Sequence, residues 1–194
     1  MAGRPRLFET ELLIDRAIEV FWARGYGASS TENLLKAMQI GQGSFYATFK
    51  GGKSELFQKS LLRFSDKAMK AFNDRLKQSD DSVKFLRTFF LSLADSSQER
   101  KQKGCFLGNT IVESAETDVQ LKNTASMLLT RLENQFKAII EQAQQNKRIT
   151  NTTPAELIAK HLITLWNGIN ITQRLYPEDK SIRAVIELNL SILH

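Results

Sequence analysis

Apolar residues recur every three or four positions along most of the chain, and no segment sustains the strict alternation typical of a strand. Leu13, Ala17 and Phe21 begin this spacing, and longer stripes of the same period follow. Helices are expected over residues 11–24, 42–49, 53–77, 82–94, 121–146, 154–175 and 178–193, with others after Ser29 and from Gly104 onward. The pattern therefore predicts an all-α fold.

Short polar residues and glycines stand where these helices are expected to begin or end. The expected N-caps are Thr10, Ser29 (in a capping box with Glu32), Gly41, Ser82 and Thr153, the last followed by Pro154 in the first helical position. Residues 98–103 are polar and basic, which predicts a surface loop. Composition excludes a disordered chain, a collagen and a coiled-coil rod.

The first fifty residues combine three short helices with a glycine turn between the second and the third, which is typical of a helix-turn-helix unit. Phe45 and Phe49 lie on one side of the third helix and leave Ser44 and Thr48 for other surfaces. Such a helix enters the major groove, where short polar side chains reach base edges. The alternative from the pattern alone is a three-helix packing unit whose polar face is merely hydrated.

The net charge is +6, and its distribution separates two parts of the chain. Residues 1–103 hold 18 basic and 12 acidic residues, whereas residues 104–194 hold nine of each. A basic part joined to a neutral part indicates one region that meets a polyanion and one with another task. A basic protein without a nucleic-acid partner is the competing interpretation. We expect a division into residues 1–52 and 53–194.

Three runs resemble the TetR family of bacterial transcriptional regulators: Gly3-Arg4-Pro5-Arg6, then Ala17, Phe21 and Gly25-Tyr26, then Gly43 to Leu56. The resemblance implies that the third helix enters the major groove and that Tyr46 and Lys53 hold the DNA backbone. The basic run at the N-terminus is similar to arms that reach into a minor groove. The predicted DNA-contacting residues are Arg4, Arg6, Ser30, Thr31, Gln42, Gly43, Ser44, Tyr46, Thr48, Lys50 and Lys53.

A weaker resemblance to the C-terminal domain of one branch of this family covers Gly104-Cys105-Phe106-Leu107, Glu113 and Trp166-Asn167-Gly168-Ile169. It implies that the last two helices pair across a two-fold axis. The predicted dimer interface is Leu157, His161, Leu165, Ile169, Ile186 and Leu190. The alternative is that these side chains form an entirely intramolecular core.

Aromatic and amide side chains of the second part could enclose a small molecule. The predicted effector-binding residues are Phe64, Phe85, Phe89, Phe106, Asn109, Met127, Trp166, Asn167 and Asn170, each of which could also be plain core. Cys105 follows several basic residues that favour a reactive thiolate. It is therefore either an oxidant or electrophile sensor or a small buried side chain.

The sequence predicts a homodimeric, ligand-responsive repressor that binds double-stranded operator DNA, with a non-specific structural DNA-binding protein as the alternative. No nucleophile–base pair, phosphate-binding loop or metal-ligand cluster is recognisable, so neither an enzyme nor a cofactor or metal site is expected. The absence of a long apolar run argues against a membrane span, and the single cysteine favours the cytoplasm.

Overall fold

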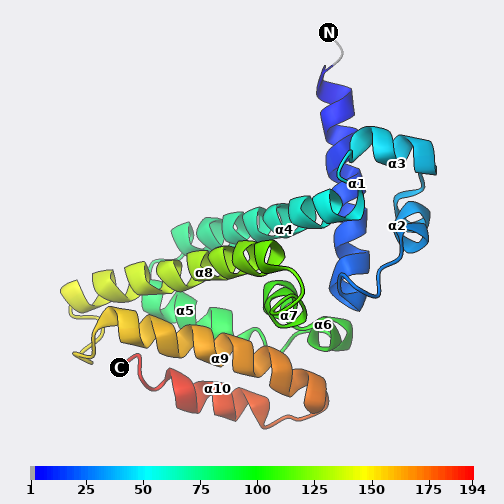
Figure 1. Ribbon diagram of the computed structural model, residues 1–194. Coiled ribbons are helices and arrows are strands. Elements are labelled where there is room, and N and C mark those ends of the chain that lie inside the picture. The colour runs from blue at the N-terminus through cyan, green and yellow to red at the C-terminus, as the bar shows by residue number, and fades with distance from the viewer. Residues whose placement is uncertain (1–2) are drawn as a thin grey trace. The chain divides into compact units, whose positions relative to one another are not determined.

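The computed structural model describes residues 3–194, with side chains from residue 9 onward, and this range is helical without a strand (Figure 1). The helices are α1 (Gly3–Arg24), α2 (Thr31–Met38), α3 (Gln42–Thr48), α4 (Gly52–Lys77), α5 (Ser82–Leu91), α6 (Gln98–Lys103), α7 (Phe106–Glu113), α8 (Val119–Gln145), α9 (Ala155–Leu175) and α10 (Ile182–Leu190). The predicted all-α fold is confirmed. No helix in the described range combines the length and low polarity needed to cross a membrane.

The chain divides into two compact units, the first formed by Met1–Ala68 and Phe106–Leu128. Phe21, Phe45, Phe49 and Phe57 are fully buried in it. The ring of Phe57 meets those of Phe21 and Phe106 edge-on, at centroid distances of 4.7 and 5.7 Å. Aromatic pairs in this arrangement add stabilisation beyond the area that they bury. The core of the first unit thus joins α1, α4 and α7.

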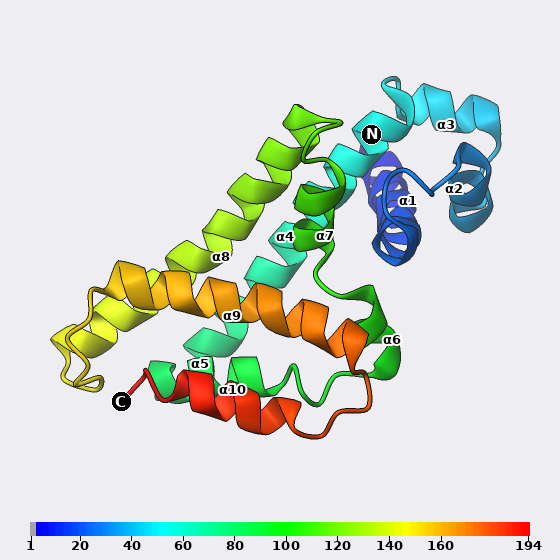
Figure 2. The same cartoon turned by 60° about the horizontal axis from the view of Figure 1, so that its bottom comes forward.

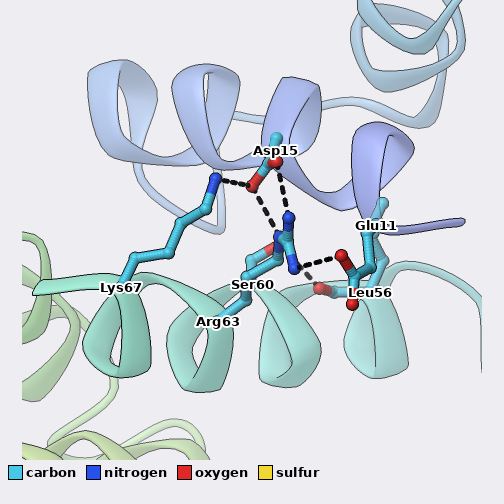
Figure 3. Close-up of polar contacts among 6 residues, drawn as sticks. All are labelled: Glu11, Asp15, Leu56, Ser60, Arg63 and Lys67. Carbon is cyan, nitrogen blue, oxygen red and sulfur yellow. Dashed lines mark hydrogen bonds and ion pairs between the residues drawn. The ribbon is translucent and has the colours of Figure 1, made fainter. Parts of the chain in front are cut away.

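An ion-pair cluster joins α1 to α4 on the same unit (Figure 3). Arg63 donates from Nε and Nη2 to the two carboxylate oxygens of Asp15, at 2.6 and 2.8 Å. Lys67 Nζ reaches the same carboxylate at 2.8 Å, and Arg63 Nη1 pairs with Glu11 at 3.1 Å. The hydrogen bond from Arg63 is the main reason that the pKa of Asp15 lies below its ordinary value. A bidentate arginine–carboxylate pair fixes the relative orientation of the two side chains as well as their distance.

The second unit comprises Met69–Cys105 and Leu129–His194. Within it α9 and α10 run side by side in opposite directions (Figure 2). The Phe89 and Trp166 rings are stacked, 5.4 Å apart and 7° from parallel, and Phe90 and Phe136 extend the aromatic cluster. Gln173 donates to the Leu93 carbonyl at 2.7 Å and thereby satisfies a buried amide.

Several expected boundaries near the N-terminus were wrong. The first helix begins at Gly3, so Thr10 lies inside it and not at its cap. The backbone of the predicted basic arm is therefore helical, while the side chains of Arg4 and Arg6 lie outside the described residues. Ser30, one position after the expected cap, accepts a hydrogen bond from Asn33 N–H and caps α2. Ser29 is fully buried instead and donates to the Gly25 carbonyl.

Corrections in the second unit have local causes. Asp81 and not Ser82 caps α5, because the Asp81 carboxylate accepts from two backbone amides. Pro154 and not Thr153 is the N-cap of α9, and it makes no side-chain hydrogen bond. Residues 98–103 form a helix and not a loop, since Ser97 caps them and Glu99 pairs with Lys103 at 2.7 Å. The last helix is shorter than predicted and begins at Ile182.

Candidate nucleic-acid interface

Helix α3 divides into a buried apolar side and an exposed polar side. Phe45 and Phe49 are fully buried, whereas Gln42, Gly43 and Ser44 are exposed. Spacing of four residues puts the two phenylalanines over the same part of the core. This packing turns the predicted base-contacting side chains outward and fixes the orientation of the helix that carries them.

The start of α3 is built from glycines with open surroundings. Gly41 is the N-cap, as predicted, and it makes no side-chain hydrogen bond. A Cβ added at Gly41 or Gly43 would meet no protein atom within 4 Å. Packing within the described chain therefore does not require glycine at position 43, and the absent side chain leaves room for another molecule to approach the α3 backbone.

Four predicted contact residues at the end of α3 and beyond it lie in different surroundings. Tyr46 is 47% exposed and Lys50 is also exposed, so both reach solvent. Thr48 is half-buried and donates its hydroxyl to the Ser44 carbonyl at 2.8 Å. The amine of Lys53 donates to the carbonyls of Tyr26 and Ser29 at 2.9 and 3.0 Å. Lys53 therefore holds the loop between α1 and α2, a role that the sequence did not suggest.

Ser30 and Thr31 begin α2 and were also predicted to contact DNA. The Ser30 hydroxyl acts as the helix cap, and Thr31 is half-buried. Two contacts that sequence reasoning missed orient α2 on α1: Arg24 donates to the Asn33 side chain at 3.2 Å, and Arg16 donates to the Met38 carbonyl at 2.9 Å. The only signal in the sequence was the basic excess to which both arginines belong.

The turn after α3 carries a further charged pair. Glu55 accepts from the Gly51 amide and pairs with Lys59, both at 2.7 Å. The hydrogen bond from Lys59 is the main cause of the lowered pKa of Glu55. This carboxylate thus stabilises the tight α3–α4 turn, in which Gly52 adopts a φ of +63°. Lys50 lies on that turn and remains exposed.

The predicted effector-binding residues fall into both units. Phe64, Phe106, Asn109 and Met127 belong to the first unit, where Phe64 meets Phe106 at 5.4 Å. Phe85, Phe89, Trp166, Asn167 and Asn170 belong to the second unit.

Each amide in the second unit has a defined environment. Asn170 is buried and donates to the Trp166 carbonyl at 2.8 Å. The side-chain oxygen of Asn167 is buried and has no hydrogen-bond partner among the described residues. A buried acceptor without a partner costs free energy, so Asn167 stands apart from the other predicted residues.

Met127 and Phe85 border shallow surface hollows. Met127 lies beside one that Val119, Gln120, Asn123 and Thr124 also line. Phe85 lies beside another, whose lining includes Arg75, Gln78 and Asp81.

The last two helices expose apolar side chains, among which Leu157 belongs to the predicted interface. Leu165, Ile169, Ile186 and Leu190 are buried within the subunit, whereas Leu157 is exposed and His161 is half-buried with Nε2 3.3 Å from the Asn189 carbonyl. Further exposed apolar residues on or beside these helices are Ile171, Leu175, Tyr176, Val185 and Leu188. The sequence pattern could not tell the inner face of these helices from their outer face, because both are apolar, and the dimer interface itself stays a prediction.

Cys105 lies between α6 and α7 and is 7% exposed. The Trp166 indole N–H donates to its sulfur at 3.5 Å. The neighbouring Arg100 donates to the Gly104 carbonyl at 2.6 Å, and burial lowers the pKa of its guanidinium. A buried, hydrogen-bonded thiol matches the structural interpretation more closely than the exposed sensor.

Individual relatives resemble the chain along most of its length. YezE of Bacillus subtilis (strain 168), an uncharacterized HTH-type transcriptional regulator, is 23% identical over 193 residues, which are 98% of this chain and 99% of that protein. The HTH-type transcriptional repressor ComR of Escherichia coli (strain K12) is 25% identical over 174 residues, 89% of this chain and 82% of ComR. A cysteine mutant of the TetR family regulator CifR, complexed with 26-base-pair operator DNA, has a TM-score of 0.80 at 21% identity, with 95% and 96% of the two chains covered.

Two family models match separate parts of the chain. Residues 13–59, which include α2, α3 and parts of α1 and α4, match the bacterial regulatory proteins of the tetR family. Residues 82–188 match the tetracyclin repressor-like C-terminal domain. These two matches, one of which spans more than half of the chain, show that it belongs to the TetR family and is a DNA-binding transcriptional regulator.

Proposed function

We propose that the protein is a homodimeric repressor that binds a pseudo-palindromic operator and leaves it when a small molecule binds in the second unit. The observation that carries the proposal is the outward polar side of α3, which exposes Gln42, Gly43 and Ser44 on a buried phenylalanine base. The side chains of Gln42 and Ser44 suit base edges, while Tyr46 and Lys50 suit phosphate oxygens. The relatives add support, because ComR is described as a repressor and a cysteine mutant of CifR is described in complex with operator DNA.

The exposed apolar side chains of α9 and α10 support the proposed dimerisation. Leu157, Ile171, Leu175 and Leu188 offer more apolar surface than a subunit alone requires. Gly168 is exposed on the same helix as the first three, and a Cβ added to it would meet no protein atom within 4 Å. Glycine in the middle of a helix is costly unless a neighbour approaches closely, and here the proposed neighbour is α9 of a second copy.

An effector would bind beside the stacked rings of Phe89 and Trp166. The unpartnered Asn167 oxygen on α9 would accept a hydrogen bond from it, which defines the ligand as a partly aromatic molecule with an N–H or O–H donor. An effector releases DNA only if it binds the non-binding conformer more tightly than the binding one. Asn167→Leu should therefore weaken the effector and spare the operator. The matched control is Asn123→Leu, since Asn123 lines a surface hollow of the first unit.

The experiment that tests the function selects fragments from random DNA with the purified protein and screens compounds that dissociate the resulting complex. We expect an inverted repeat whose half-sites lie about 34–36 Å apart, one turn of B-DNA. Specific affinity should exceed non-specific affinity by about 10³ or more. A monomer without preference for any inverted repeat would overturn the proposal, and a small affinity ratio would favour the structural DNA-binding protein.

A further inference from the structure

Glu113, the last residue of α7, holds the loop between α1 and α2 from a distance of 86 to 87 residues along the chain. One carboxylate oxygen accepts from the Tyr26 amide at 2.9 Å and the other from the Gly27 amide at 2.7 Å. Two consecutive amides directed at one carboxylate form a small anion-binding concavity. Charge-assisted hydrogen bonds of this kind are stronger than those between neutral groups.

The two glycines beside Tyr26 make room for this carboxylate. A Cβ at Gly25 would lie 2.7 Å from one Glu113 oxygen, and a Cβ at Gly27 would lie 3.1 Å from the other. Gly25 also has a φ of +79°, which suits the end of α1. Gly27 has no such backbone requirement, so its lack of a side chain is explained by the carboxylate alone.

Other polar contacts of this loop come from residues of the loop itself and from the first turn of α4. Lys53 donates to the Tyr26 and Ser29 carbonyls and lies 4.3 Å from the Tyr26 ring centroid. Ser29 donates to the Gly25 carbonyl at 2.6 Å. Ser30, the next residue, caps α2. The carbonyls of the loop are thus held by the helix-turn-helix segment itself, whereas two of its amides are held by α7.

Helix α7 is anchored at its other end by aromatic packing. The Phe106 ring meets Phe57 at 5.7 Å and Phe64 at 5.4 Å, and Phe57 meets Tyr26 at 4.9 Å. Eight residues make a rod of about 12 Å. Phe106 begins α7 and Glu113 ends it, so this helix connects the aromatic cluster of Phe57 and Phe64 to the α1–α2 loop, all within the first unit.

We propose that Glu113 is a positioning residue for operator recognition. It fixes the α1–α2 loop, and through the Ser30 cap and α2 it fixes α3 in the arrangement that reads DNA. The inference rests on the proposed function and adds a named contact to it. A shift of α7 would remove the carboxylate from both amides and release the recognition helix.

The test compares Glu113→Gln with Glu116→Gln, which removes the same charge from an exposed residue just after α7. The operator is the one selected with the wild-type protein, and both its dissociation constant and that of a scrambled duplex are measured by fluorescence anisotropy. We expect Glu113→Gln to weaken operator binding about tenfold or more, since an amide cannot accept from both N–H groups. Binding of the scrambled duplex should change less than about twofold, because phosphate contacts dominate it.

Hydrogen exchange without DNA gives the second readout, and the Tyr26 and Gly27 amides should exchange faster in Glu113→Gln only. If both glutamate variants behave alike, or if operator and scrambled duplex weaken equally, the inference fails. Success of the wild-type selection establishes operator binding independently, so this failure leaves the proposed function standing.

A cycle with Gly27→Ala keeps the inference testable if Glu113→Gln loses stability. In the wild type the new Cβ would lie 3.1 Å from a carboxylate oxygen and push it back by a few tenths of an ångström, so we expect Gly27→Ala to lose part of the operator affinity that Glu113→Ala loses. In the Glu113→Ala background the same methyl group meets no carboxylate, so the added loss should be less than about twofold. Additive losses from the two substitutions would show that Gly27 and Glu113 act separately and would overturn the proposal.

Discussion

Helices α3 and α9 each expose a glycine with open space around it, and they differ in what surrounds that glycine. Gly43 on α3 lies among the polar side chains of Gln42 and Ser44, whereas Gly168 on α9 shares its helix with exposed Ile171 and Leu175. Polar neighbours suit a hydrated, charged partner, and apolar neighbours suit a protein partner. The open space at both glycines supports the proposal that another molecule approaches closely there. The neighbouring side chains favour DNA as the partner at Gly43 and a second copy of the chain at Gly168.

The largest effect should come from charges placed on the apolar surface of the last two helices. The double variant Ile171→Glu with Leu188→Glu should be monomeric in sedimentation at micromolar concentration. Its operator affinity should fall about 100-fold or more, because two half-sites no longer act together. Met127→Glu, an exposed change in the first unit, is the control and should remain dimeric. A dimeric double variant would place the interface elsewhere.

The glycine comparison is sharpened by the same substitution at both positions. Gly43→Ala should weaken the operator about tenfold while the helix itself gains up to about 0.5 kcal/mol in stability. Gly168→Ala should raise the dimer dissociation constant and leave the DNA contacts of a saturated dimer unchanged. Anisotropy and sedimentation on both variants separate the two roles. Equal effects on both readouts would remove the distinction between the helices.

The ion pairs of the two regions should differ in strength. In the first unit the side chains of Arg63 and Asp15 are 21% and 29% exposed. In the second unit those of Arg183 and Asp95 are 45% and 64% exposed. Asp15→Asn should lower the free energy of unfolding by about 1 kcal/mol, and Asp95→Asn should change it little. Urea unfolding of the two variants measures both values. A larger loss for Asp95→Asn would reverse this order.

The pH dependence of the Asp15 contribution follows from its lowered pKa. The folded protein holds the carboxylate ionised to lower pH than the unfolded chain does, so the contribution is complete above the unfolded value of about 3.9. It is lost as the pH falls further, through the folded-state pKa. Asp15→Asn should therefore flatten the acid limb of stability against pH and leave the curve near pH 7 parallel to that of the wild type.

A smaller effect is expected from a single phosphate contact. Lys50→Ala should reduce the slope of log affinity against log salt by about 0.9, the value for one phosphate on duplex DNA. The loss should be similar for operator and scrambled duplexes, since a phosphate contact carries no base information. Lys180→Ala removes an exposed lysine from the second unit and should leave the slope unchanged. Titrations at several salt concentrations provide the measurement.

The smallest effect is expected at Cys105. Cys105→Ser should keep the wild-type operator affinity within about twofold, and native Cys105 should react with iodoacetamide much more slowly than the unfolded chain, because its sulfur is buried against Trp166. Rapid alkylation together with loss of DNA binding would instead support the redox or electrophile sensor. Mass spectrometry of timed samples measures the rate.

Local spacing determined the elements of this protein. The 3.6-residue periodicity that begins at Leu13 and Ala17 predicted the helical class, and the spacing of Phe45 and Phe49 predicted which side of α3 is buried. These features involve residues within one or two helical turns, so the sequence contains them directly. The cap of α2 was not predicted correctly, since Ser29 has the capping-box spacing with Glu32, yet Ser29 is buried and the adjacent Ser30 accepts the hydrogen bond from Asn33.

Only the tertiary structure decided which groups meet across the chain. The sequence does not show that Lys53 donates to the carbonyls of the α1–α2 loop. Nor does any residue near Tyr26 indicate that the Glu113 carboxylate accepts from the Tyr26 amide. Likewise, Leu165 and Leu157 are both apolar residues of α9, yet one is buried in the subunit and the other exposed. A side chain carries its chemistry in the sequence, but its partner depends on how the helices pack, and that packing is a property of the whole chain.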